Sequence, residues 1–67
     1  MITEIGLAAG DIWHYLDVKG EAFLSDMAKD LERSRDLLLM SLGWLEREGH
    51  IVVLKNEGDY KVSLRKK

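Results

Sequence analysis

The sequence contains no cysteine and no proline, and only one phenylalanine among its 67 residues. Without cysteine, neither a disulfide nor a thiolate metal site can stabilise so short a chain. His14 and His50 lie far apart and have no evident companion ligands, so we expect no metal and no other cofactor. The length allows one domain, residues 1–67, whose small core we expect to be reinforced by dense helix packing or by self-association.

Long apolar runs are also missing. No segment approaches the roughly 20 apolar residues that a membrane span requires. The N-terminus lacks the basic segment and apolar stretch of a signal peptide. These absences favour a soluble, cytoplasmic protein without membrane contact.

Motifs for catalysis are missing as well. The sequence has no glycine-rich phosphate loop, no serine nucleophile motif and no cluster of carboxylates. His14 has Asp11 and Asp17 three positions away on either side, but such a pair is far more often a surface contact than an acid–base site. We therefore expect that the protein is not an enzyme.

The charge changes sign along the chain. Residues 1–32 hold seven acidic and two basic side chains, residues 33–50 hold three of each, and residues 51–67 hold two acidic and five basic ones. A DNA-binding domain usually has a clear basic face. Here only the C-terminal segment meets that condition.

The N-terminal third has helical periodicity. Residues 3–18 predict a helix with Thr3 as its N-cap and Gly20 just past its end. Gly6 and Gly10 either leave a flat stripe where another backbone can approach closely, or fray the first turns. The apolar side of this helix consists of Ile5, Ala8, Ala9, Ile12, Trp13 and Leu16.

Two shorter helices and a hairpin are predicted to follow. A short extended piece at 21–25 leads to Ser25, the predicted N-cap of a helix whose apolar face is Met27, Ala28 and Leu31. Ser34 caps a helix from about Arg35 to Glu48.

The tail changes to the period of strands. Residues 51–54 and 60–64 read as two strands joined by a four-residue loop at 56–59, in which Gly58 takes positive φ. The predicted fold is therefore α+β, mainly α: a winged helix-turn-helix with three helices, a short strand and a C-terminal β-hairpin wing.

Two stretches carry a family resemblance. The run Leu42-Gly43-Trp44-Leu45-Glu46-Arg47-Glu48-Gly49, together with Gly10-Asp11-Ile12-Trp13, resembles a family of very short prokaryotic winged-helix proteins of uncharacterised function. The resemblance covers nearly the whole chain. It implies the winged-helix fold, but no DNA site, substrate or catalytic residue.

The third helix has an unusual outer side. Leu38, Ser41, Leu42 and Leu45 take the core-facing positions, whereas a DNA reader would carry hydrogen-bonding side chains on the other side. Arg35 and Asp36 fall near that side, but so do four residues whose side chains offer no such group: Leu39, Met40, Gly43 and Trp44. They predict an interface with a second copy, forming a homodimer, or with another protein.

A competing interpretation places these side chains inside one chain. Trp44 and Met40 would fold back against the first helix or the wing and enlarge a single core. Val52 and Leu54 alternate with Ile51 and Val53, so the strand is apolar on both faces, which supports extra burial.

The alternative function is a small DNA-binding transcriptional regulator. Basic side chains of the third helix, the wing and the tail would contact phosphates, giving weak, salt-dependent and sequence-indifferent binding. These are Arg33, Arg35, Lys55, Lys61, Arg65, Lys66 and Lys67. An equally open interpretation is that they form only a solubilising rim around an apolar hairpin.

Overall fold

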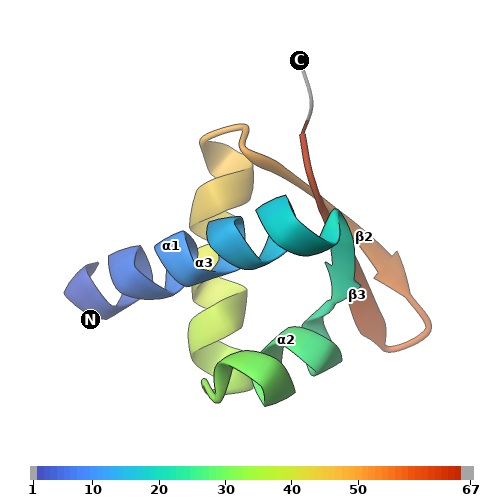
Figure 1. The fold of residues 1–67 in the computed structure, drawn as a ribbon, viewed down its shortest axis with the longest axis horizontal. Helices are drawn as coiled ribbons and strands as arrows, with labels where there is room; N and C mark the ends of the chain where they lie inside the picture. Colours follow the sequence, from blue (N-terminus) through green and yellow to red (C-terminus); the bar gives the residue numbers. More distant parts are fainter. Residues whose placement is uncertain (1, 66–67) are drawn as a thin grey trace.

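Three helices and a three-stranded antiparallel sheet make up the computed structural model, which describes residues 2–65 (Figure 1). The chain order is α1 (Ile2–Lys19), β1 (Glu21–Phe23), α2 (Leu24–Leu31), α3 (Arg35–Arg47), β2 (Ile51–Asn56) and β3 (Asp59–Leu64). α1 crosses α3, and the β2–β3 hairpin forms the wing (Figure 1). The expected winged helix-turn-helix is confirmed.

α1 is an unbroken helix through both of its glycines. It begins at Ile2, so Thr3 lies inside the helix and its prediction as N-cap was wrong. Gly20 ends the helix with φ of 87°, as expected. Trp13 was predicted on the core side but is exposed, because the buried stripe is narrower than the apolar one. Within residues 2–65, no helix is both long enough and apolar enough to cross a membrane.

The start of α2 differs from the prediction. Ser25 is not its N-cap, because the helix begins at Leu24, two residues earlier than expected, and Phe23 occupies the N-cap position without a capping side chain. The capping group is instead Asp59 of the wing. Its carboxylate accepts from the Ser25 amide at 3.3 Å and from the Ser25 hydroxyl at 2.6 Å. An acidic group from β3 therefore stabilises the positive end of α2 and joins the wing to the helices.

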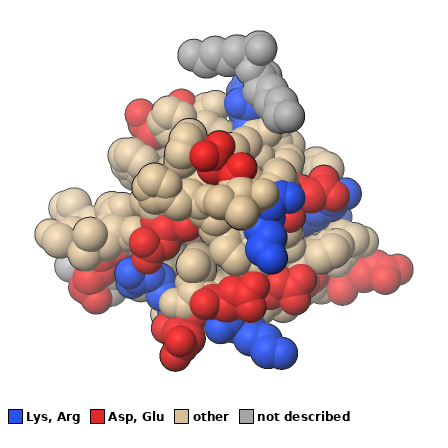
Figure 2. Space-filling model, viewed as in Figure 1, with Lys and Arg blue, Asp and Glu red and all other residues tan. Residues whose placement is uncertain are grey.

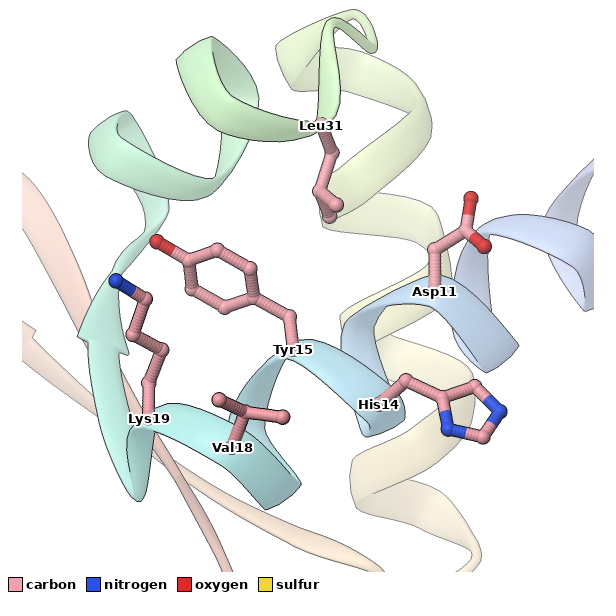
Figure 3. A pocket seen from close by; sticks show the side chains of 6 residues that line it. All are labelled: Asp11, His14, Tyr15, Val18, Lys19 and Leu31. Atoms are coloured by element: carbon pink, nitrogen blue, oxygen red, sulfur yellow. The ribbon is translucent and has the colours of Figure 1, made fainter.

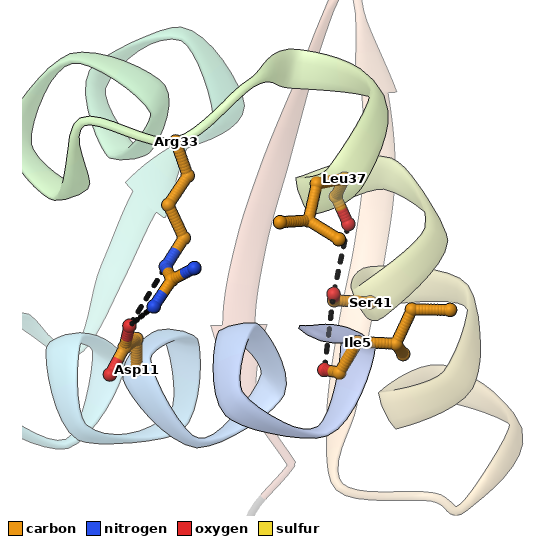
Figure 4. A network of polar contacts seen from close by, with 5 residues as sticks. All are labelled: Ile5, Asp11, Arg33, Leu37 and Ser41. Carbon is orange, nitrogen blue, oxygen red and sulfur yellow. Dashed lines mark hydrogen bonds and ion pairs between the residues drawn. The ribbon is translucent and has the colours of Figure 1, made fainter. Parts of the chain in front are cut away.

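α3 follows the sequence closely. The Ser34 hydroxyl accepts from the Leu37 amide at 3.1 Å, which confirms the predicted cap. The Ser41 hydroxyl, fully buried, donates to the Leu37 carbonyl at 2.8 Å and lies 3.3 Å from the Ile5 carbonyl of α1 (Figure 4). This small residue therefore lets α1 and α3 pack closely. The buried side of α3 is the predicted one: Leu38, Ser41, Leu42 and Leu45.

The wing has a tighter turn than predicted. Asn56 and Asp59 are paired strand residues, so the loop consists of Glu57 and Gly58 alone and not of four residues. Their φ angles are 47° and 84°. Two consecutive positive φ values give the turn the twist that a tight hairpin requires.

The sheet has the strand order β1-β3-β2 and presents only one face to the helices. Ile51 and Val62 are buried on that face. Val52 and Leu54 point to the other face and are exposed, Leu54 by 60%. The expected burial of both faces of this strand was therefore wrong within a single chain.

The hydrogen bonds between Asp59 and Ser25 predict an acid-sensitive link. The pKa of the Asp59 carboxyl lies below its ordinary value of 3.8, because the Ser25 hydroxyl donates to it and the Tyr60 amide does so as well. A carboxylate whose pKa is lowered by folding stabilises the folded state at pH values above the pKa that it has in the unfolded chain. This contribution is lost as the pH falls through the pKa that it has in the folded state. We expect Asp59→Asn to be less stable than the wild type at neutral pH and to lose less stability below about pH 4.

Urea unfolding followed by circular dichroism at several pH values measures both effects. Glu57→Gln is the matched control, because Glu57 lies two residues away at the exposed wing tip. Equal unfolding free energies for the two variants at neutral pH would contradict the role given to Asp59.

Candidate functional site

Trp44 is the most conspicuous side chain on the outer part of α3. It remains 49% exposed, and Met40, one turn earlier on the same side, is exposed too. The interpretation that these two side chains fold back to enlarge a single core is therefore wrong. Trp44 instead lies beside the N-terminal half of α1, where it forms the wall of a depression.

α1 and α3 together enclose an apolar groove at this point. Two adjoining hollows of about 360 and 540 Å³ share Gly6 and Trp44 in their walls. We call them together the Trp groove, defined by Ile2, Ile5, Gly6, Gly10, Trp13 and Trp44. His50 lines one of the hollows and is the only ionisable side chain among the lining residues.

The two glycines give the Trp groove a floor of bare backbone. A methyl group added at Gly6 or Gly10 would meet no atom within 4 Å. The glycines therefore do not serve the packing of this chain, and each costs roughly 1 kcal/mol of helix stability relative to alanine. Because the helix is unbroken at both glycines, they form a flat stripe on its surface and do not fray its first turns.

The predicted interface residues are only partly brought together. Met40 and Trp44 are four residues apart and share one side of α3. Leu39 precedes Trp44 by five residues, about 140° around the helix, so it lies away from the Trp groove. Gly43 is exposed on the outermost side of α3 and lines neither hollow.

Apart from the stripe of Gly6 and Gly10, the contribution of α1 to the Trp groove was not predicted from the sequence. Ile2 and Trp13 belong to the exposed surface, and Trp13 was assigned to the core instead. A usable signal was present, because Gly6, Gly10 and Trp13 follow at intervals of four and three and therefore share one side of the helix. What periodicity could not give was the direction from which α3 crosses α1.

The basic side chains predicted to contact nucleic acid are partly engaged within the chain. Arg33 pairs with Asp11 of α1, with its Nη2 2.6 Å and its Nε 2.9 Å from the same carboxylate oxygen (Figure 4). Lys61 pairs with Glu21 across the sheet at 3.3 Å. Arg35 lies close enough to Asp59 to help lower the pKa of that carboxyl. Each of these cations therefore has a nearby carboxylate.

The other predicted contacts lie on the hairpin and in the tail. Lys55 and Arg65 are exposed on the hairpin, and Lys66 and Lys67 lie outside the described residues. Figure 2 shows acidic and basic side chains mixed over one side of the molecule, without a continuous basic band. Among the described residues, Arg33, Arg35 and Lys61 each lie near a carboxylate, whereas Lys55 and Arg65 are exposed.

A further depression lies between α1 and the end of α2, with a volume of about 380 Å³ (Figure 3). Its polar groups have partners: the Tyr15 hydroxyl donates to Asp30 at 2.6 Å, and the Lys19 ammonium lies 5.8 Å from the centre of the Tyr15 ring. The bond to Asp30, with some desolvation, raises the pKa of Tyr15 to about 12. The Tyr15–Asp30 hydrogen bond joins α1 to α2 at this depression.

Metal-binding chemistry finds no support in the described part of the chain. No group of three or more histidine, aspartate or glutamate side chains is placed to hold an ion within residues 2–65. His14 makes an edge-to-face contact with the ring of Trp13, 5.6 Å between centroids. Asp11, its possible acid–base companion, is paired with Arg33.

Comparisons with known proteins agree with the architecture. The family model for the winged helix-turn-helix domain DUF2582 matches residues 1–64. The chain is also 37% identical, over 68 residues, to the uncharacterized protein MJ1608 of the archaeon Methanocaldococcus jannaschii, and the alignment covers 97% of this chain and 96% of that protein. Both matches extend over nearly the whole chain, from α1 through the wing. The protein therefore belongs to the DUF2582 family of winged helix-turn-helix domains.

Proposed function

We propose that this protein is a non-enzymatic association module that forms a homodimer by burying the Trp grooves of two copies against each other. The observation that carries the proposal is the exposure of Trp44 beside the uncovered stripe of Gly6 and Gly10. The half-exposed ring offers an apolar side chain, and the bare helix backbone beside it offers a flat surface against which the ring of a second copy can pack.

The size of the apolar surface favours a partner. Exposed patches above a few hundred Å² are uncommon on monomers, and a stable interface needs about 800 Å² from each copy. α3 alone is too small, but the Trp groove extends the surface along α1 to Ile2 and Trp13, both exposed. In a two-fold dimer the same surface is used twice, so Trp44 of each copy can lie over the glycines of the other.

The small size of the hydrophobic core also favours a dimer. A chain of this length buries a modest core and has no disulfide. Binding of a second copy stabilises the folded state by mass action. Dimer formation would thus add to the stability that the small core provides.

The DNA-binding alternative has weaker support, because Arg33 and Lys61 are in ion pairs with Asp11 and Glu21. A mobility-shift assay with duplex DNA at low salt tests it. If DNA bound to the wing, a shifted band would form at low salt and would disappear with added salt and on charge reversal at Lys61 and Arg65. We expect no such band. Such a band would make the wing a nucleic-acid contact.

Truncation of Trp44 is expected to dissociate the proposed dimer. A buried tryptophan at the centre of an interface typically contributes 2 kcal/mol or more, so Trp44→Ala should raise the dissociation constant about 30-fold or more. Sedimentation equilibrium over a wide concentration range measures this.

Val18→Ala is the matched control for Trp44→Ala. Val18 is 84% exposed and lies on the other side of α1 from Trp13, so its truncation should leave the mass distribution unchanged. A wild type that stays monomeric at the highest concentration, or an unchanged distribution for Trp44→Ala, would refute the dimer.

Gly10→Ala separates folding from association. The added methyl group has free space in the single chain and removes a helix-destabilising glycine, so the free energy of unfolding should rise by about 0.5–1 kcal/mol. The same group would hold the partner away from the helix backbone and weaken association. Chemical unfolding in dilute solution and sedimentation equilibrium at higher concentration measure the two effects. Association as tight as in the wild type would exclude close packing at Gly10.

A further inference from the structure

β2 forms a free edge of the sheet. In the order β1-β3-β2 it has a strand on one side only. The Arg65 amide donates to the His50 carbonyl, which marks that pair as hydrogen-bonded. Because bonded and non-bonded pairs alternate in an antiparallel ladder, Val52 and Leu54 bond to β3, whereas Ile51, Val53 and Lys55 direct their backbone groups outward.

One of these outward groups is covered by a side chain. The Val53 amide donates to the Glu46 carboxylate of α3 at 3.3 Å, and the contact is exposed. Natural proteins use charged side chains in this way to blunt an exposed strand edge. A long, solvent-accessible bond of this kind is easily exchanged for a backbone carbonyl.

Both faces beside the β2 edge carry exposed apolar side chains. Val52 and Leu54 are exposed on the outer face of the sheet. On the other face, α3 contributes Leu39, which is also exposed. Arg35 and Glu46 of α3 both approach the wing. Leu39 lies one turn after Arg35 and two turns before Glu46, so it is on the same side of α3.

We propose that a second copy of this chain docks at the β2 edge, so that the two β2 strands pair antiparallel about Val53. This register places Val53 opposite its twin, with two backbone hydrogen bonds between them. Val52 then lies opposite Leu54 of the second copy in a close, non-hydrogen-bonded pair, and the reverse pair forms at the same time. The exposed apolar side chains of the outer face thus cover each other.

Charge is complementary in the same register. Lys55 of the second copy comes opposite Ile51, on the face of the sheet where Glu46 lies, because Ile51, Val53 and Lys55 share that face. When the Val53 amide passes to its new backbone partner, the Glu46 carboxylate gains a lysine ammonium nearby. The carboxylate that caps the edge in one chain therefore has a partner in the pair.

The β2 contact is separate from the Trp groove. Trp44 and Glu46 are two residues apart, about 200° around α3, and so face in different directions. A chain with two self-complementary surfaces is joined to a neighbour at each of them, and the assembly extends beyond a dimer. The edge contact goes beyond the proposed function and does not depend on it.

The test compares four forms of the full chain by sedimentation velocity at rising concentration: the wild type, Trp44→Ala, Leu54→Glu and the double variant. Leu54 lies opposite Lys61 in the ladder, so a glutamate there gains a cross-strand cation within the chain while it places a charge beside Val52 of the second copy. Val18→Glu makes the same change at an exposed site outside both surfaces and serves as control.

We expect species larger than a dimer for the wild type and for Val18→Glu, a limit at the dimer for each single variant, and a monomer for the double variant. The Trp44→Ala dimer should dissociate with a dissociation constant raised about tenfold or more by Leu54→Glu. A Trp44→Ala variant that is already monomeric, or a Leu54→Glu variant with the wild-type distribution, overturns the edge contact. A Trp44→Ala variant with the wild-type distribution overturns only the dimer through the Trp groove.

A second variant guards against misfolding. Val53→Pro removes the outward amide, and no ladder bond to β3 is lost because that amide does not face β3. In the Trp44→Ala background, a folded Val53→Pro protein by circular dichroism should be monomeric. A folded variant that still dimerises as Trp44→Ala does would equally overturn the edge contact.

Discussion

The close crossing of α1 over α3 is the contact on which the rest of this structure depends. It is made possible by small buried residues, Ala8 and Ala9 on one helix and Ser41 on the other. The hydroxyl of Ser41 turns back to the carbonyl groups around it and so adds no unsatisfied polar atom to the core. Figure 1 shows the two helices crossing, and the Trp groove lies beside this crossing, since Ile5 and Ala9 of α1 line it together with Trp44 of α3.

Much of this architecture could be predicted because the relevant signals are local. The core stripe of α3, its Ser34 cap and the glycine that ends α1 each depend on residues within one or two turns. The errors arose where a distant residue decided the outcome. Ser25 is a good capping residue, yet Asp59, 34 positions later in the chain, accepts from its amide.

At the candidate site, too, local features could be predicted from the sequence and tertiary contacts could not. The polar deficit of α3 was visible in the sequence, but the choice between burial and exposure of Trp44 depended on the direction in which α1 crosses. The basic residues could be counted, but not their engagement, since Arg33 finds Asp11 only once α1 and the turn before α3 are packed together. Spacing along one helix predicts which residues share a side, and tertiary packing decides what that side meets.

The two-residue turn of the wing has a consequence for how the molecule meets other molecules. A longer loop would allow several side chains to extend from the end of the wing, but here the tip consists of Glu57 and Gly58 alone. The side chain at the tip of the wing is therefore the carboxylate of Glu57, and Asp59 follows at the start of β3. A polyanion approaching along the wing axis encounters negative charge first, whereas a cationic or uncharged surface meets no such barrier. The length of this one turn therefore decides which charge stands at the end of the wing.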